Sequence, residues 1–342
     1  MQQRAQLRFT TLSSTGRRPA MTAFVASALA MAATLGMADE TAPGLLAQPA
    51  LPAAGGLDEL PQVQVSAPEP RYVAPTRRDR IGRIWAPVLI NGKGPFRMVL
   101  DTGASHSGVT ERVAEAIGAP LDQSEPVLLR GVTGSAQVPT IRVDSFMVGD
   151  LLLRPAVLPI VIDALGGADG ILGTEGLEDK RVFIDFRHDL ITITHSHLER
   201  AGFDFVTLPM QRSHLGLIQL PARVAGVKVT AILDTGGQST IGNYAMRDAL
   251  MRHARLLARP EEIIGVTTDA QSAESYPTPP IELGPIRIQS ARVAYGEMRI
   301  FEHWKLTKEP VLLIGMDAIG LLDVVIIDYR RRELQIRMHG GS

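Results

Sequence analysis

The sequence contains the same short pattern twice, an apolar run that leads directly into Asp-Thr-Gly. The first copy spans residues 98–103 and the second spans residues 231–236. One such triplet in a chain of this length would be weak evidence, because all three residue types are common. Two copies, each preceded by three apolar residues, predict that one structural unit occurs twice in the chain.

Further landmarks recur at similar distances after each triplet. A candidate helix N-cap, Thr110 or Asn243, follows each Asp by nine residues, and a Gly-Val-Thr segment follows by 30 or 31 residues. The later landmarks are an apolar-apolar-Gly motif at 170–173 and 312–315, and an Ile-Asp-aromatic-Arg motif at 184–187 and 327–330. Because order and spacing are kept, the region from about 80 to 338 is predicted to be two copies of one unit.

As a set, these motifs resemble those of the aspartic peptidases, in particular the retropepsin-like branch in a two-lobed, single-chain layout. The resemblance covers roughly three quarters of the chain. It implies an all-β, bilobal fold of two pseudo-symmetric, β-barrel-like lobes with one short helix each. It also implies one catalytic Asp from each half, Asp101 and Asp234, at the interface between the lobes.

The family pattern also implies roles for the neighbours of the two Asp residues. Thr102 and Thr235 are expected to hydrogen-bond across the interface, while Gly103 and Gly236 let backbone N–H groups approach the carboxylates without a Cβ. The motifs ending at Gly173 and Gly315 are expected to brace the two loops. The flap residues expected to close over an extended peptide are Gly131, Val132, Thr133, Gly265, Val266 and Thr267.

Two carboxyl groups held together can hydrolyse a peptide bond without further groups. Two carboxyl groups this close cannot both be ionised, so the pair shares one proton. The ionised carboxylate activates a water, and the protonated one stabilises the tetrahedral intermediate. No cofactor and no metal is expected; His195 and His197 lack further ligands at zinc-site spacing and fit a solvated loop. The chain has no cysteine, which excludes thiol chemistry.

The chain departs from pepsin-like enzymes at the residue after each triplet. Those enzymes place Ser or Thr there, whereas this chain has Ala104 and Gly237. Losing a donor to the anion raises its pKa, so we expect an activity optimum at mildly acidic to near-neutral pH. After the triplet, the second copy continues with Gly-Gln-Ser at 237–239, whereas the first continues with Ala-Ser-His at 104–106. This difference fits divergence within a working dyad, or a second lobe that has kept the loop and lost catalysis.

The N-terminal region differs in composition from the repeats. Residues 1–38 resemble an export signal, with four Arg residues, an uncharged Ala-rich run at 21–38 and a small-x-small cleavage candidate at 36–38. An uncleaved membrane anchor is the alternative. Residues 39–76 are rich in Pro, Ala and Gly and are predicted to be a flexible linker, with a removable pro-segment as the alternative. The lobes are predicted at 77–200 and 201–342.

Local patterns complete the expected architecture. Strand, Gly-rich turn and strand at 85–100 predict a β-hairpin that delivers the first Asp, and 216–233 repeat it. Short helices are expected at 111–117 and 244–257.

These observations favour an exported aspartic-type endopeptidase, periplasmic or secreted, that acts on peptide or protein substrates as a monomer. A net charge of −1 gives no case for nucleic-acid binding. The alternative is a peptide-binding or scaffold protein that keeps the fold without turnover. Both Asp residues are intact, which favours the peptidase.

Overall fold

The computed structural model describes residues 82–338, apart from 122–124, 163–165, 214–215, 252–257 and 268. It also describes three short strands nearer the N-terminus, β1 (Phe9–Thr11), β2 (Met31–Ala33) and β3 (Val73–Pro75). The remainder of the predicted export signal and linker lies outside the described residues. No helix in the described part of the chain is long and apolar enough to cross a membrane.

The first half of the repeat is built on a six-stranded sheet in the order β11-β10-β4-β5-β13-β6. Its strands are β4 (Trp85–Ile90), β5 (Lys93–Leu100), β6 (Gly108–Val109), β10 (Phe146–Val148), β11 (Leu151–Leu153) and β13 (Gly170–Leu172). Two small sheets accompany it, formed by β7 (Val127–Arg130) with β8 (Ser135–Val138) and by β9 (Thr140–Val143) with β12 (Ala156–Pro159). The predicted hairpin at 85–100 is the β4–β5 pair.

The second half repeats this arrangement within a larger sheet in the order β1-β24-β23-β18-β19-β26-β20-β25-β22-β21-β2, with β17 paired to β18. The strands are β17 (Gln211–Arg212), β18 (Ile218–Val224), β19 (Val227–Leu233), β20 (Ile241–Gly242), β21 (Arg259–Ile264), β22 (Ala270–Pro277), β23 (Ile281–Leu283), β24 (Ile286–Ile288), β25 (Arg292–Tyr295) and β26 (Val311–Ile314). Here β19 and β26 pair in parallel, as β5 and β13 do in the first half.

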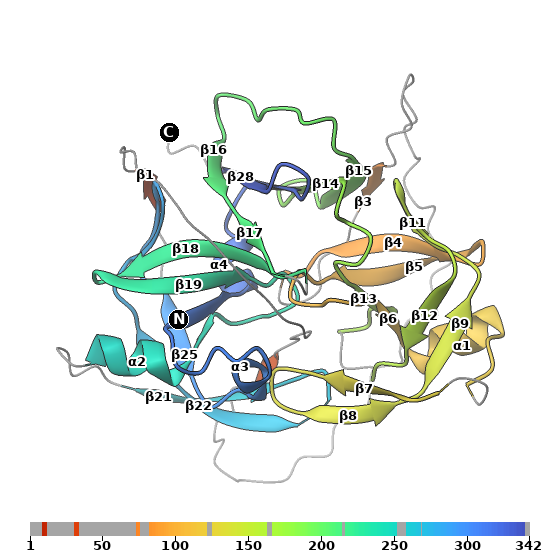
Figure 1. Cartoon of the computed structure of the whole chain (residues 1–342), viewed down its shortest axis with the longest axis horizontal. Coiled ribbons are helices and arrows are strands. Elements are labelled where there is room, and N and C mark those ends of the chain that lie inside the picture. The colour runs from red at the N-terminus through yellow and green to blue at the C-terminus, as the bar shows by residue number, and fades with distance from the viewer. Residues whose placement is uncertain are drawn as a thin grey trace, which may run out of the picture.

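A third sheet joins the two halves in the order β16-β28-β27-β14-β15-β3. Its remaining strands are β14 (Lys180–Asp185), β15 (Leu190–His195), β16 (Val206–Pro209), β27 (Val324–Asp328) and β28 (Glu333–Arg337). β14 of the first half pairs antiparallel with β27 of the second. Figure 1 shows the β4–β5 and β18–β19 hairpins on opposite sides of the molecule, with β14 and β28 along the edge between them.

The helices are short, and α1 and α2 lie at opposite outer sides of the molecule (Figure 1). α1 (Glu111–Ile117) buries Val113, Ala114 and Ile117, which lie on one face, and Gly118 ends it in the left-handed conformation. α2 (Tyr244–Met251) begins after Asn243, whose Oδ1 accepts the Met246 N–H. The second half carries two further short helices that the sequence pattern did not predict, α3 (Arg299–His303) and α4 (Met316–Ile319).

The main core explains why the two halves hold together. One continuous cluster of buried apolar residues contains Ile84 and Leu100 of the first half as well as Leu233 and Ile314 of the second. Leu100 and Leu233 end the strands that carry the two Asp-Thr-Gly loops, so the loops rest on packed, rigid supports. The chain therefore has the all-β, bilobal architecture that the repeat predicts.

Candidate active site

Each Asp-Thr-Gly loop begins where a buried strand ends. Asp101 follows β5, and its backbone N–H donates to the Leu172 carbonyl of β13 at 3.0 Å. Asp234 follows β19, and its N–H donates to the Ile314 carbonyl of β26 at 3.0 Å. The parallel pairing of these strands fixes where each carboxyl group emerges. The two apolar-apolar-Gly motifs thus contact the loops that they were expected to brace.

The two threonines bind the loops to each other. Thr102 Oγ1 donates to the Leu233 carbonyl at 2.7 Å, and Thr235 Oγ1 donates to the Leu100 carbonyl at 2.7 Å. In addition, the Thr102 N–H donates to Thr235 Oγ1 and the Thr235 N–H donates to Thr102 Oγ1, each at 3.1 Å. All four bonds are buried and cross between the halves, so they fix the spacing of the two catalytic candidates.

The side chains of Asp101 and Asp234 form a hydrogen bond with each other. Asp101 is fully buried and Asp234 is 2% exposed. Asp101 Oδ2 is buried, and no N–H or hydroxyl donor reaches it. The Gly103 N–H donates to Asp101 Oδ1 at 2.8 Å, and the Gly236 N–H donates to Asp234 Oδ1 at 3.1 Å.

The two loop glycines leave no room for a side chain. A Cβ on Gly103 would lie 2.9 Å from Asp234 Oδ1 and 3.1 Å from Asp101 Oδ1. A Cβ on Gly236 would overlap the Asp101 carboxyl group. Each glycine therefore faces the Asp of the opposite half, and only glycine permits the two carboxyl groups to approach.

Burial governs the titration of the pair. Desolvation is the largest cause that raises the pKa of Asp101, to about 7, while the Gly103 N–H, the Asp234 carboxyl and the Arg83 guanidinium each act to lower it. The pKa of Asp234 is raised well above its ordinary value by desolvation and then by the charge of Asp101. Near neutral pH the buried pair therefore holds a proton that two exposed aspartates would have lost.

The residues after the triplets fit this electrostatic pattern. Ala104 is fully buried and offers no hydroxyl to the dyad. Gly237 offers only its backbone N–H, which donates to Asp234 Oδ1 at 3.0 Å. Both carboxyl groups are consequently held by backbone donors and by each other.

The two predicted flap segments are the turns of two β-hairpins, β7–β8 and β21–β22. Val132, in the β7–β8 turn, is fully buried among apolar residues of the second half, including Ile241, Ile300 and Leu313. Val266, in the β21–β22 turn, is 1% exposed and packs with apolar residues of the first half, Trp85, Val99, Ala104, Val161, Ala168 and Ile171. Each flap tip is thus buried in the opposite lobe, and both hairpins lie along the same edge of the molecule (Figure 1).

The flap tips also touch one another. A Cβ on Gly131 would lie 2.9 Å from Val266 Cγ1, and a Cβ on Gly265 would overlap Thr133 Oγ1. The Ile300 N–H donates to the Val132 carbonyl at 3.2 Å, which ties the first flap to the second lobe. Thr267 Oγ1, in contrast, donates to Asp269 within its own flap at 2.9 Å. In this arrangement both flaps are closed and the dyad is covered.

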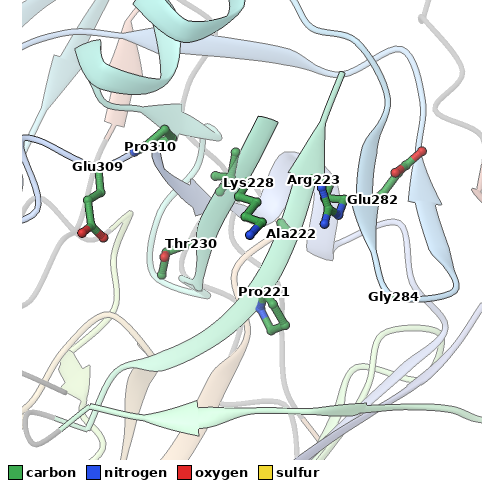
Figure 2. Close-up of a pocket in the computed structure, with 10 residues that line it drawn as sticks. Pro221, Ala222, Arg223, Lys228, Thr230, Glu282, Gly284, Glu309 and Pro310 are labelled. Atoms are coloured by element: carbon green, nitrogen blue, oxygen red, sulfur yellow. The ribbon is translucent and has the colours of Figure 1, made fainter. Parts of the chain in front are cut away.

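A separate hollow of about 710 Å³ lies on the outer side of the second half. Figure 2 shows its lining on β18 and β19, on the β23–β24 turn and on the segment before β26. Arg223 and Lys228 are its cations, and Glu282 and Glu309 are its anions. None of its lining residues belongs to the Asp-Thr-Gly loops or the flaps, so the hollow is not part of the dyad site.

Two features near the dyad were not found from the sequence. Arg83 is fully buried and its charge acts on Asp101, yet an Arg before an apolar strand reads as a surface residue. Two hydroxyl–carboxyl pairs, Ser107 with Glu175 and Thr240 with Asp317, flank the loops, and their hydroxyl residues are buried. The sequence contained a signal for both pairs, because they occupy equivalent positions in the repeat. Among the described residues, no group of three His, Asp or Glu side chains is placed to hold a metal.

Comparison with known families agrees with this geometry. The family model described as aspartyl protease matches residues 86–175 and 220–318, one stretch in each half. No curated protein matches the sequence significantly. The matched stretches cover more than half of the chain and include both Asp-Thr-Gly loops, so the chain belongs to the aspartyl protease family.

Proposed function

We propose that this chain is an aspartic-type endopeptidase that hydrolyses peptide bonds with a water activated between Asp101 and Asp234. The observation that carries the proposal is that two buried carboxyl groups lie close together, each facing the loop glycine of the other half and each acting on the titration of the other. Such a pair supplies a base and an acid in one place. Both halves contribute to the reaction, because each loop keeps its Asp, its Thr and its backbone donors.

The mechanism follows from the shared proton. The ionised carboxylate accepts a proton from a water that attacks the amide carbon, while the protonated carboxyl donates to the carbonyl oxygen and stabilises the tetrahedral intermediate. Proton transfer to the amide nitrogen then allows the C–N bond to break, which returns the pair to one proton. The four threonine bonds hold the two groups in place through these steps.

Substrate entry requires the flaps to move. With Val132 and Val266 buried over the dyad, an extended peptide can reach the carboxyl groups only after at least one tip has left its apolar pocket. We expect the flaps to close again over the bound peptide and to pair with its backbone. Closure excludes water and strengthens the electrostatic interactions at the dyad.

Four Arg residues followed by an Ala-rich run support export through the N-terminal segment, with a periplasmic or secreted product.

Because the pKa of Asp101 is raised to about 7, one carboxylate and one carboxyl coexist at higher pH than in an exposed pair. We expect an optimum between mildly acidic and neutral pH; an optimum at or below about pH 3 would contradict this.

The test is cleavage of a mixed peptide library by the full chain, read by mass spectrometry. Wild type should cut internal bonds, and Asp101→Asn and Asp234→Asn should each lower kcat by at least a thousandfold. The exposed Asp144, changed to Asn, is the control that should keep wild-type activity. If Asp234→Asn stays active, the second lobe does not contribute catalysis; if wild type binds peptides without cutting them, the chain is a peptide-binding protein.

A further inference from the structure

A hydroxyl residue stands six positions after each catalytic candidate. Ser107 follows Asp101, and Thr240 follows Asp234 at the same offset. Both hydroxyl residues are buried, Ser107 fully and Thr240 at 2% exposure. They mark the far end of the two loops, opposite the strand ends from which Asp101 and Asp234 emerge.

Each hydroxyl residue is bound to a carboxyl group from the other side of its lobe. The Ser107 N–H donates to Glu175 Oε1 at 2.6 Å, and the Ser107 side chain also bonds to Glu175. The Thr240 N–H donates to Asp317 Oδ2 at 3.0 Å, and Thr240 Oγ1 donates to Asp317 Oδ1 at 2.6 Å. Glu175 and Asp317 each stand two positions after the bracing glycine, Gly173 or Gly315.

The hydroxyl oxygens in turn accept from the bracing glycines. The Gly173 N–H donates to Ser107 Oγ at 3.0 Å, and the Gly315 N–H donates to Thr240 Oγ1 at 3.2 Å. A hydroxyl has a single proton to donate. When the carboxylate accepts that proton, a lone pair of the oxygen is left facing the glycine N–H. The carboxylate therefore sets the orientation of the hydroxyl.

The residue before each glycine holds the catalytic candidate itself. Leu172 accepts from the Asp101 N–H, and Ile314 accepts from the Asp234 N–H. The loop is also bound beyond the glycine, where Thr174 N–H donates to the Ala104 carbonyl at 2.9 Å and Met316 N–H donates to the Gly237 carbonyl at 2.9 Å. Both ends of each loop are thus attached to one short segment of three residues.

We propose that Glu175 and Asp317 are positioning residues for peptide hydrolysis, which hold the two Asp-Thr-Gly loops through the hydroxyl groups of Ser107 and Thr240. This inference rests on the proposed function. Neither carboxyl group belongs to the pair that shares the proton, so their effect on the reaction is through the geometry of that pair. Small displacements of a catalytic group cost large factors in rate.

The surroundings of the two carboxyl groups differ. Desolvation raises the pKa of Glu175, while Ser107 and the charge of His106 act to lower it; its Oε2 is buried without a hydrogen-bond partner. Arg212 lies beyond it, with Nη2 at 3.4 Å from the Thr174 carbonyl and 2.8 Å from Glu178 Oε1.

Asp317 has a different set of neighbours. Although much of the residue is exposed, its carboxyl group faces protein, and desolvation raises its pKa to about 6. The bonds from Thr240 act to lower this pKa, and the charge of Glu261 acts to raise it. Glu261 itself accepts from Ser239 Oγ at 3.1 Å.

The first test uses the shape-matched substitutions Asp317→Asn and Glu175→Gln in the full chain. In Asp317→Asn, an NH₂ group replaces one of the two oxygens that accept from Thr240, so the side chain cannot receive both bonds. In Glu175→Gln, the oxygen that accepts from Ser107 loses its charge and becomes a weaker acceptor. We expect kcat to fall at least tenfold in each variant, with KM within twofold of wild type. The exposed Glu115 and Glu309 serve as controls, and their Gln variants should keep the wild-type kcat.

The second test separates positioning from simple loss of folding. Thr240→Ser keeps the hydroxyl and should retain kcat within threefold, whereas the isosteric Thr240→Val should lose at least tenfold. The ratio of wild-type kcat to Asp317→Asn kcat should increase as the pH rises through about 6, because only the ionised Asp317 accepts both bonds. A purely structural role would give a ratio independent of pH.

The outcomes are distinct from those for the peptidase itself. A wild-type chain that cuts no peptide overturns the proposed function. An active wild type whose Asp317→Asn and Thr240→Val variants keep their full kcat overturns the positioning role alone. Equal losses for Thr240→Ser and Thr240→Val would also overturn it, because the hydroxyl would then not be the group that matters.

Discussion

At the scale of single residues, the site depends on groups that are removed from water. Asp101 and Asp234 lie under two flaps, and no hydroxyl from Ala104 or Gly237 stabilises their charge. Backbone N–H groups and the buried Arg83 offset only part of the desolvation. The pKa values of the pair are therefore set by burial first and by specific partners second.

The raised pKa of Asp101 makes folding stability depend on pH. Its pKa rises from 3.8 to about 7 on folding, so the folded protein binds this proton more tightly than the unfolded chain does. The stabilisation is complete below about pH 4 and is lost as the pH rises toward 7. We expect the free energy of unfolding in urea to fall over this window in wild type.

The variant Asp101→Asn isolates this contribution. Asn does not titrate, so the fall in the free energy of unfolding between pH 4 and 7 should be smaller than in wild type. A residual slope is expected, because desolvation also raises the pKa values of Asp234, Glu175 and Asp317. The exposed Asp144→Asn variant is the control and should keep the full wild-type slope. An identical slope in Asp101→Asn would contradict the assignment.

At the scale of elements, the two flap hairpins are the parts of the molecule that the proposed peptidase activity requires to move. Their valine tips are buried in exchanged positions, each in the lobe that does not carry its hairpin. Burying a valine side chain stabilises a structure by about 1.5–3 kcal/mol. This energy favours the closed arrangement in the absence of a peptide, and a bound peptide must offset it.

A disulfide across the flap tips should therefore block turnover. Gly131 and Val266 suit it, since a Cβ on Gly131 would lie 2.9 Å from Val266 Cγ1, and the chain has no cysteine to compete. The oxidised Gly131→Cys/Val266→Cys variant should lose at least 90% of its activity in a continuous peptide-cleavage assay, and dithiothreitol should restore it. Each single Cys variant serves as the control and should not respond to the reductant. Full activity of the cross-linked form would show that substrate enters without flap separation.

At the scale of the whole molecule, the sheet that joins the halves carries a buried ion pair. Arg181 Nη1 of β14 lies 3.0 Å from Asp328 Oδ2 at the end of β27, and the Asp328 side chain is fully buried. Ser196 Oγ and the Arg331 N–H also donate to Asp328. Asp328 therefore links both halves.

Removing the Arg181 guanidinium should destabilise the whole fold and not one lobe alone. Arg181→Met leaves a buried carboxylate without its partner, and we expect a loss of about 3–5 kcal/mol in the free energy of unfolding. Urea unfolding followed by circular dichroism would measure it. The control is Arg337→Met, which breaks an ion pair to the half-exposed Asp204 and should cost less than about 1 kcal/mol. Equal losses in the two variants would argue against a special role for the interlobe pair.

Much of the fold and the site could be predicted from the repeat. The two triplets located Asp101 and Asp234, the hairpin pattern gave β4–β5 and β18–β19, and Gly118 marked the end of α1. Thr110 occupies the predicted N-cap position, yet its Oγ1 bonds to the Asp169 carbonyl, because a residue distant in sequence lies closer than the helix N–H groups. The extent of the predicted export signal, linker and lobes stays a prediction.

The sequence by itself determined which residues belong to equivalent positions, because an internal repeat preserves order and spacing whatever the chain folds around. Only the tertiary structure decided which of these positions meet. Val132 and Val266 each pack into the lobe that does not carry their hairpin, and the charge of Arg83 acts on Asp101. Ser107 binds Glu175, and Thr240 binds Asp317. These relations depend on packing between segments far apart in the chain. A local sequence pattern does not contain the information on how deeply such packing buries a side chain.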